Sequence, residues 1–209
     1  ALNGQYEFSM TLFNLPSSII PPLTMSLGPA GAAALTRRDH QRVGTLVNTS
    51  LRLTTLLAFP AGVGLSVLAG PILVLLYPAQ YDAAVAATYH LQILGIASVF
   101  VCIMLLTNAI LQAHGKAKVP IITMFIGGAV KVVANYLLVG NPDINIKGAR
   151  IGTLVCYALI CVLNLIMINR TLVSRPSYAQ LFLKPLAATA GMAVVARVSY
   201  TFLSGALGN

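Results

Sequence analysis

The sequence predicts an all-α protein, a polytopic bundle of about six membrane-spanning helices. Of its 209 residues, 57% are hydrophobic and only 8% are charged, and the mean hydropathy is +0.85. Soluble domains carry about a quarter charged residues, whereas helices satisfy their own backbone hydrogen bonds inside a bilayer. Apolar segments long enough to cross a membrane alternate with short basic loops. We therefore expect a single transmembrane domain over residues 1–209, with spans near residues 6–35, 43–77, 86–113, 118–140, 148–169 and 178–207.

The first segment is uncharged from Phe8 to Thr36. It contains four prolines, Pro16, Pro21, Pro22 and Pro29. Because proline removes a backbone hydrogen-bond donor, we expect a broken or bent helix from about Tyr6 to Leu35. Asn14 lies near the break and is a candidate cavity-lining residue. A flexible, cavity-lining helix and a static kink explain the prolines equally well.

The second segment, residues 43–77, is too long for one straight span. We expect an interfacial extension followed by a span over residues 53–76, bent at Pro60 and Pro71. Arg52 lies at the boundary between these two parts. Its side chain can snorkel toward the lipid headgroups, or its guanidinium can contact an anionic headgroup or a substrate phosphate.

The third segment, Leu91 to Ala113, carries two amides four residues apart, Asn108 and Gln112, which share one helix face. Amide side chains in spans commonly bond to neighbouring helices, so helix packing is favoured over a substrate contact for this pair. His90 and His114 flank the span, and we interpret both as interfacial side chains.

The fourth segment contains the most informative pattern. Residues 119–140 hold one charge, Lys131, and a charge at that depth costs about 3 kcal/mol or more. Thr123, Gly127, Lys131 and Asn135 recur every four residues and so form a stripe on one helix face. We predict that this stripe lines a polar cavity. The alternative is that Lys131 is buried against the carbonyls of a neighbouring helix for structure alone.

The fifth segment, Ile151 to Ile168, has a small-residue face that suits the close approach of a neighbouring helix. This face consists of Gly152, Thr153 and Cys156. The sixth segment, residues 178–207, is less uniform, and we assign it as a span with charges toward its two interfaces. Three residues interrupt it, Lys184, Pro185 and Arg197.

Composition and motifs exclude several classes of function. The net charge of +9 does not indicate a nucleic-acid partner, because the basic residues fall between apolar segments rather than forming a stripe with aromatics. The three cysteines form no CxxC pair and have no histidine at ligand spacing, so we predict no metal, cofactor or disulfide. An enzyme acting on polyprenyl phosphates needs carboxylates. The acidic residues lie at span ends, remote from one another: Glu7, Asp39, Asp82 and Asp143.

The distribution of basic residues predicts the orientation. The loops after the first, third and fifth segments, residues 36–42, 114–118 and 169–177, contain Arg37, Arg38, Arg42, Lys116, Lys118, Arg170 and Arg175. The loops after the second and fourth segments contain only Lys147 and Arg150. The positive-inside rule therefore places the first set of loops in the cytoplasm and both chain ends outside. A chain that starts without methionine and stops outside after a weak span is expected to be a piece of a longer protein.

Four stretches together resemble the C-terminal half of the multidrug/oligosaccharidyl-lipid/polysaccharide (MOP) exporter superfamily. They are LFNLPSSIIPPLTMSLGPA at 12–30, RLTTLLAFPAGVGLSVLAGPILVLLY at 52–77, LTNAILQAHGKAKVP at 106–120, and GGAVKVVANYLLV with INIKGARIGT between 127 and 153. Within the superfamily, the chain most resembles the stage V sporulation protein B and polysaccharide-biosynthesis branch, which is related to the lipid II flippase. The resemblance covers roughly residues 6–172.

This resemblance implies two lobes of helices around a central cavity that works by alternating access. The chain would form part of the C-terminal lobe, and its partners would be the bilayer, a lipid-linked oligosaccharide substrate and the missing N-terminal lobe. The implied function is export of an undecaprenyl-linked precursor across the bacterial inner (plasma) membrane. The implied ion-coupling positions are Lys131, Asn135 and Thr153. Because a lysine replaces a neutral or acidic sodium ligand there, proton or membrane-potential coupling is favoured over sodium.

Two other functions stay open. A multidrug or cation antiporter of the same superfamily would want an acidic residue within the spans, and none of the six segments has one. A non-transporting membrane scaffold of cell-envelope synthesis is only mildly disfavoured by the broken first segment and the Lys131 stripe. For a transporter, the residues predicted to line the cavity are Asn14, Arg52, Asn108, Gln112, Thr123, Gly127, Lys131 and Asn135.

Overall fold

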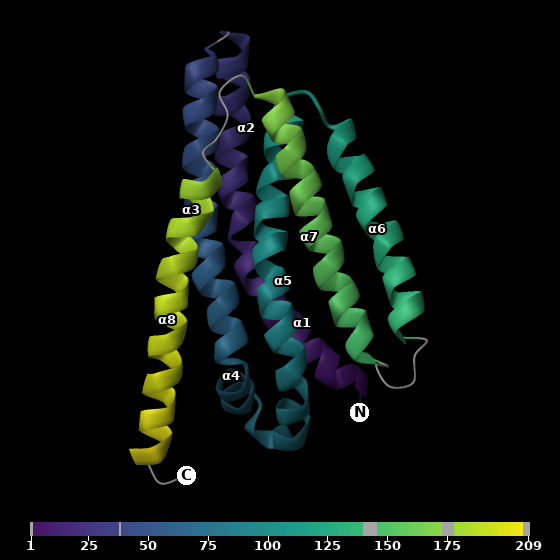
Figure 1. Ribbon diagram of the computed structural model, residues 1–209, viewed down its shortest axis with the longest axis vertical. Coiled ribbons are helices and arrows are strands. Elements are labelled where there is room, and N and C mark those ends of the chain that lie inside the picture. Colours follow the sequence, from purple (N-terminus) through teal and green to yellow (C-terminus); the bar gives the residue numbers. More distant parts are fainter. Residues whose placement is uncertain (1, 38, 140–145, 173–177, 207–209) are drawn as a thin grey trace.

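The computed structural model describes residues 2–37, 39–139, 146–172 and 178–206, and all regular elements within these ranges are helices. Most of the long helices run roughly along one axis (Figure 1). The predicted all-α bundle is therefore confirmed. The elements are α1 (Leu2–Ser18), α2 (Ile20–Thr36), α3 (His40–Val67), α4 (Ala69–Leu76), the short 3₁₀ helix η1 (Pro78–Gln80), α5 (Tyr81–Ala113), α6 (Lys118–Val139), α7 (Ile146–Thr171) and α8 (Tyr178–Ala206).

Helix α5 forms the centre of the bundle. It packs against α1, α2, α3, α4 and α7, and 72% of the residues in its most apolar stretch are buried. The corresponding share is only 17% for α6 and for α8, which lie at the two edges of the bundle (Figure 1). The edge helices therefore present most of their apolar surface outward, to lipid or to other protein.

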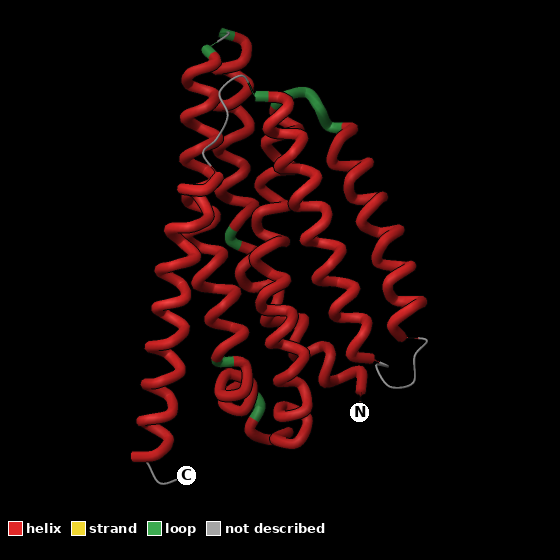
Figure 2. The backbone as a smooth tube through the Cα atoms, viewed as in Figure 1, coloured by secondary structure: helices red, strands yellow, loops and turns green. Residues whose placement is uncertain are grey.

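Five stretches of the described residues are helical, long and apolar enough to cross a membrane: α3, η1 with α5, α6, α7 and α8. The first segment is not among them, because it is divided into α1 and α2, of 17 residues each. The interruption falls at Ile19, between Pro16 and Pro21, and is visible in Figure 2. The break predicted from the prolines is thus confirmed, and the described ranges contain about five uninterrupted candidate spans.

The second segment forms one long helix and a short one. Helix α3 runs without interruption from His40 to Val67 and passes Pro60 without ending, so the expected boundary near Arg52 between an interfacial extension and a span is not marked by a break in the helix. The chain is interrupted instead at Leu68, just before Pro71. Pro71 is the third residue of α4, where a backbone N–H has no acceptor within its own helix, so a proline there costs little.

Helix α8 packs on α3, near a backbone carbonyl that a proline leaves without its usual donor. Pro185 has no N–H, so the carbonyl of Leu181, one turn earlier, loses its usual helical donor. The Thr55 hydroxyl of α3 lies 3.2 Å from this carbonyl oxygen. It lies closer to two acceptors in its own helix, the carbonyl oxygens of Leu51 at 2.9 Å and Arg52 at 3.0 Å, so the three share its one hydrogen. Close by, the rings of Phe59 and Phe182 meet edge to face, with centroids 6.3 Å apart, and this aromatic contact also joins α8 to α3.

The ends of the helices agree with the predicted loop arrangement. The α2–α3 turn, the α5–α6 connection and the end of α7 lie at one end of the bundle, and α4 lies toward the other (Figure 1). Helix α5 begins at Tyr81, earlier than expected, because η1 replaces a longer loop. Residues 140–145 and 173–177, which hold most of two predicted loops, are outside the described ranges, as is Arg38.

Candidate functional site

The polar stripe of α6 lies against α7. Thr123 and Gly127 are buried, and Lys131 and Asn135 are half-buried. A methyl group added at Gly127 would overlap the side chain of Ile160 on α7. The absence of a side chain at Gly127 therefore lets α7 approach the middle of the stripe.

Lys131 and Asn135 lie farther along the same helix contact, in the second half of α6. The Cys156 sulfur of α7 would lie 3.3 Å from a Cβ added at Gly127. The Asn135 oxygen Oδ1 is buried and has no hydrogen-bond partner. It rests against Gly152, where an added Cβ would come within 2.6 Å of it. Gly152 and Cys156 thus form the surface of α7 against which α6 packs, as predicted for a small-residue face. Thr153 is buried beside them.

Nearer the basic end of the bundle, a buried amide joins three helices. Asn164 of α7 is fully buried, and its Oδ1 accepts a hydrogen bond from the Thr123 hydroxyl of α6 at 2.8 Å. Its Nδ2 donates to Asn108 Oδ1 at 2.7 Å and to Thr107 Oγ1 at 3.2 Å, both on α5. Asn108 Nδ2 in turn lies 3.8 Å from the sulfur of Met124. We call Asn164, Thr107, Asn108 and Thr123 the Asn164 cluster.

Asn108 bonds to α7, which is a helix-packing contact, whereas its predicted partner on the same face, Gln112, is exposed. Asn164 and Thr107 were not identified as site residues from the sequence. They could have been found by comparing how far each polar residue lies from the end of its own helix. Asn108 lies five residues before the end of α5, Thr123 five residues after the start of α6, and Asn164 seven residues before the end of α7. All three helix ends face the same side of the bundle, so these polar residues lie at a similar depth.

The structure does not bring the remaining predicted residues to the stripe. Asn14, Arg52 and Gln112 are exposed on α1, α3 and α5, and within the described ranges none of them has a recorded hydrogen bond or ion pair with α6. Neither do the described residues contain a cluster of metal-ligating side chains. The cavity-lining role of these residues and of the stripe stays a prediction.

Comparison with known proteins identifies the family. Residues 5–137, more than half of the chain, match the model of the MatE family. The chain belongs to the MatE family. This is a family of membrane transporters and not of enzymes, and its members are multi-pass membrane proteins.

Two curated proteins of Bacillus subtilis (strain 168) are similar in sequence. The uncharacterized membrane protein YabM is 28% identical over 169 residues, 81% of this chain and 30% of YabM. The lipid II flippase MurJ is 26% identical over 160 residues, 76% of this chain and 29% of MurJ. The chain therefore spans about 30% of the length of these relatives.

A solved structure shows the same fold. It is the inward-facing conformation of a multidrug resistance MATE family transporter of the MOP superfamily, and it matches 88% of this chain with a TM-score of 0.61 and 19% sequence identity. The match covers 44% of that transporter. The helices described here thus correspond to part of a larger transporter fold.

Proposed function

We propose that the protein containing this chain is a flippase for undecaprenyl-linked cell-wall or polysaccharide precursors in the bacterial plasma membrane. The observation that carries the proposal is Lys131, a half-buried cation and the one charged residue between positions 119 and 139 of α6. Ionisable residues inside spans are costly and usually mark a substrate or ion pathway. The similarity to a lipid II flippase over 76% of the chain supports a lipid-linked, anionic substrate.

In this proposal the chain supplies part of the C-terminal lobe of an alternating-access transporter. The headgroup passes through the central cavity beside the α6 stripe, and the lipid tail stays in the bilayer. A cation at that depth attracts a diphosphate strongly, because little water screens the charges. The basic loops 36–42, 114–118 and 169–177 are cytoplasmic in this arrangement.

Lys131 is also the basis for our proposal on which gradient drives transport. Asn135 lies one turn from Lys131, and its buried Oδ1 has no partner, so it offers an acceptor that a lysine ammonium can reach by changing rotamer. An ammonium held there takes the position of a free metal ion between α6 and α7. We therefore propose coupling to protons or to the membrane potential rather than to sodium.

The decisive experiment replaces Lys131 in the full-length protein and measures flipping of a fluorescent lipid-linked precursor in proteoliposomes. Lys131→Met keeps the volume and removes the charge, and we expect the rate to fall roughly tenfold or more. Lys118→Met, at the exposed start of the same helix, is the matched control and should retain the wild-type rate. Equal rates for both variants would contradict a role for Lys131.

The same vesicles test the coupling. Replacing sodium by choline should leave the wild-type rate unchanged, whereas collapsing the proton gradient and the membrane potential should abolish net transport. A strict requirement for sodium would contradict the tethered-ammonium proposal while leaving the flippase proposal intact.

A multidrug antiporter of the same superfamily is the second candidate, because the solved structure with the same fold is a multidrug transporter. An antiporter would need an acidic residue within a span. Within the described membrane-crossing stretches the acid is Asp82, which lies in the first turn of α5 and not deep in a span. Efflux of cationic dyes that depends on Lys131, without flipping of lipid-linked precursors, would favour the antiporter.

A further inference from the structure

Helix α8 carries an exposed lysine, Lys184, whose depth follows from the contacts between α8 and α3. The Leu181 carbonyl oxygen lies beside the Thr55 hydroxyl. Farther along both helices, the Met192 methyl group lies 3.6 Å from a Cβ added at Gly64, so α8 runs parallel to α3. Because Lys184 is three residues beyond Leu181, it is level with the residue three beyond Thr55. This level is about 27 Å from the start of α3 and about 13 Å from its end.

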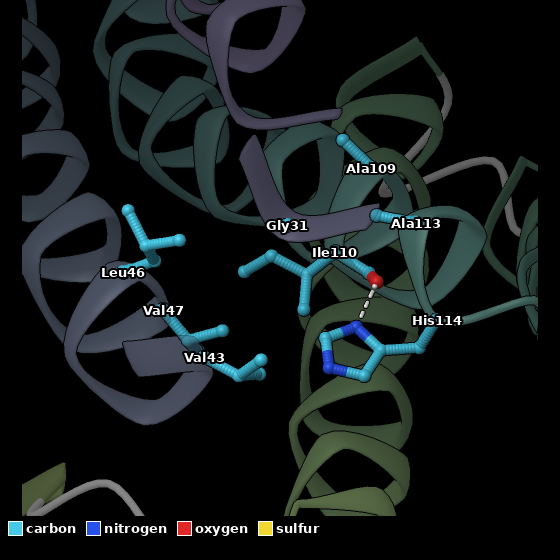
Figure 3. A pocket seen from close by; sticks show the side chains of 8 residues that line it. All are labelled: Gly31, Val43, Leu46, Val47, Ala109, Ile110, Ala113 and His114. Atoms are coloured by element: carbon cyan, nitrogen blue, oxygen red, sulfur yellow. Dashed lines mark hydrogen bonds between the residues drawn. The ribbon is translucent and has the colours of Figure 1, made fainter. Parts of the chain in front are cut away.

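The contacts of α3 with the central helix α5 show that this level lies inside the span. At the basic end, Val43 of α3 and His114, which follows the end of α5, line the same small apolar space (Figure 3). Toward the other end, a Cβ added at Gly95 of α5 would lie 2.8 Å from the Ser66 nitrogen of α3, and α5 continues beyond that point. We expected the charges of α8 at its two interfaces. Lys184 lies deep between them instead, because the start of α8 packs beside the middle of α3.

Lys184 has no partner among the described residues, for which no hydrogen bond or ion pair to its side chain is recorded. Helix α8 packs against α3, and neither of these helices contains an acidic residue. The lysine side chain is shorter than its distance to either end of α3, so it does not reach the headgroups by snorkelling. A cation exposed to hydrocarbon at such a depth is costly. Its face of α8 is therefore unsuited to lipid.

Small side chains lie on the same face of α8 as Lys184. Ala187, Ala188 and Gly191 follow it at intervals of three, four and seven residues, and all three are exposed. A Cβ added at Gly191 would have no neighbouring atom of the described residues within 4 Å. The outer face of α6 differs, since it presents large apolar side chains such as Phe125, which is 79% exposed. Small residues allow the backbone of another membrane helix to approach closely.

We propose that this face of α8 packs against a further membrane helix of the same transporter, and that a carboxylate of that helix pairs with Lys184. The solved transporter of the same fold is matched over 44% of its length, so more than half of such a fold lies outside this chain. Charged residues inside spans pair with one another, which selects a carboxylate as the partner of a lysine. The proposal does not depend on the transported substrate.

The sign of a stability change tests the ion pair in the full-length protein in bicelles. Lys184→Met leaves the carboxylate buried without its partner, and we expect Tm to fall by about 4 °C or more. Lys184→Arg keeps a cation and should recover most of this loss. Arg197→Met, on the same helix about 20 Å farther along, is the matched control and should change Tm little. If Lys184 faced lipid, Lys184→Met would raise Tm, because it removes a charge from hydrocarbon.

A second measurement tests what covers the face. A spin label is attached at Ala188→Cys in a cysteine-free full-length protein in lipid vesicles. Its collisions are measured with oxygen, which concentrates in lipid, and with a water-soluble nickel chelate. We expect both collision rates to be low, because a helix covers the position. A label at Lys118→Cys, which is exposed at the basic end of α6, provides the reference for contact with water.

Each alternative occupant gives a different result that would overturn the proposal. Frequent oxygen collisions, with a higher Tm for Lys184→Met, would assign the face to lipid. Frequent collisions with the nickel chelate would assign it to a water-filled passage. An unchanged Tm for Lys184→Met, together with lost flipping, would assign Lys184 to the transported anion and would leave the flippase proposal intact. Any result without a fall in Tm for Lys184→Met contradicts the ion pair.

Discussion

Two helix crossings in this bundle are held together by different kinds of contact. Where α3 crosses α5, the backbones approach closely: a Cβ added at Gly95 would lie 2.7 Å from the Gly62 carbonyl oxygen and 2.8 Å from the Ser66 nitrogen. Where α5, α6 and α7 meet, the contact is made by side chains, through the hydrogen bonds of Asn164 to Thr123 and Asn108. The first crossing is made mainly by close approach of the backbones, with one side-chain bond from Ser66 to the Gln92 carbonyl, and the second is made by several side-chain hydrogen bonds.

This difference indicates how each crossing responds to amino-acid substitution. In a bilayer, helices associate through close packing and interhelical hydrogen bonds, since lipid is as apolar as leucine. A glycine crossing gains dispersion contacts that no larger residue permits, so it tolerates almost no substitution. A polar cluster gains only about 0.6 kcal/mol for each hydrogen bond, but those bonds form in one rotation and depth of the helices. The first crossing therefore supplies tight packing, and the second supplies register.

The largest expected effect comes from the glycine crossing. Gly95→Ala places a methyl group against the α3 backbone, which cannot move aside as a side chain would. We expect a loss of about 3 kcal/mol in unfolding free energy. Gly128→Ala on α6 is the matched control, because nothing lies within 4 Å of it, and it should lose no stability. Unfolding of the full-length protein in bicelles measures both, and equal effects would show that the α3–α5 contact is looser than described.

A smaller effect is expected from the polar cluster. Asn164→Leu removes three side-chain hydrogen bonds, which predicts a loss of about 2 kcal/mol. Asn169→Leu is the control on the same helix, because the buried Oδ1 of Asn169 has no partner, and it should be close to neutral. The same unfolding assay applies. A greater loss for Asn169→Leu would mean that burial of the amide, rather than its bonding, decides stability.

The comparison also explains which features could be predicted from the sequence. Composition and segment length predict membrane helices because both depend on local chemistry, and the prolines predict the break at Ile19. Periodicity predicts that Thr123 and Lys131 share a face, but it does not say which neighbour that face meets. The structure shows that it meets α7, which leaves the predicted cavity role untested.

The partners of polar residues are harder to predict, because they depend on the order and depth of packed helices. Asn164 is one of a few polar residues in the apolar fifth segment, and no pattern within that segment relates it to Thr123. Likewise, Gly62 and Gly95 are unremarkable in a chain with 17 glycines, and they become special only where two helices cross. Both sites are determined by tertiary contacts that periodicity in a single helix does not contain.

The smallest effect tests whether the two crossings are independent. Ser66→Ala removes one bond to the Gln92 carbonyl, 2.8 Å long, and Thr123→Val removes the bond to Asn164; each should cost about 0.6 kcal/mol. In double-mutant cycles with Asn164→Ala, we expect Thr123→Val to show a coupling of about 0.6 kcal/mol and Ser66→Ala to show none. Sites farther apart than about 10 Å are usually additive, and Gly95 and Thr107, twelve positions apart on α5, are separated by a rise of about 18 Å. A measurable coupling between Ser66 and Asn164 would therefore mean that α5 transmits strain along its length, so that the tight crossing and the polar crossing act as one unit when the helices move.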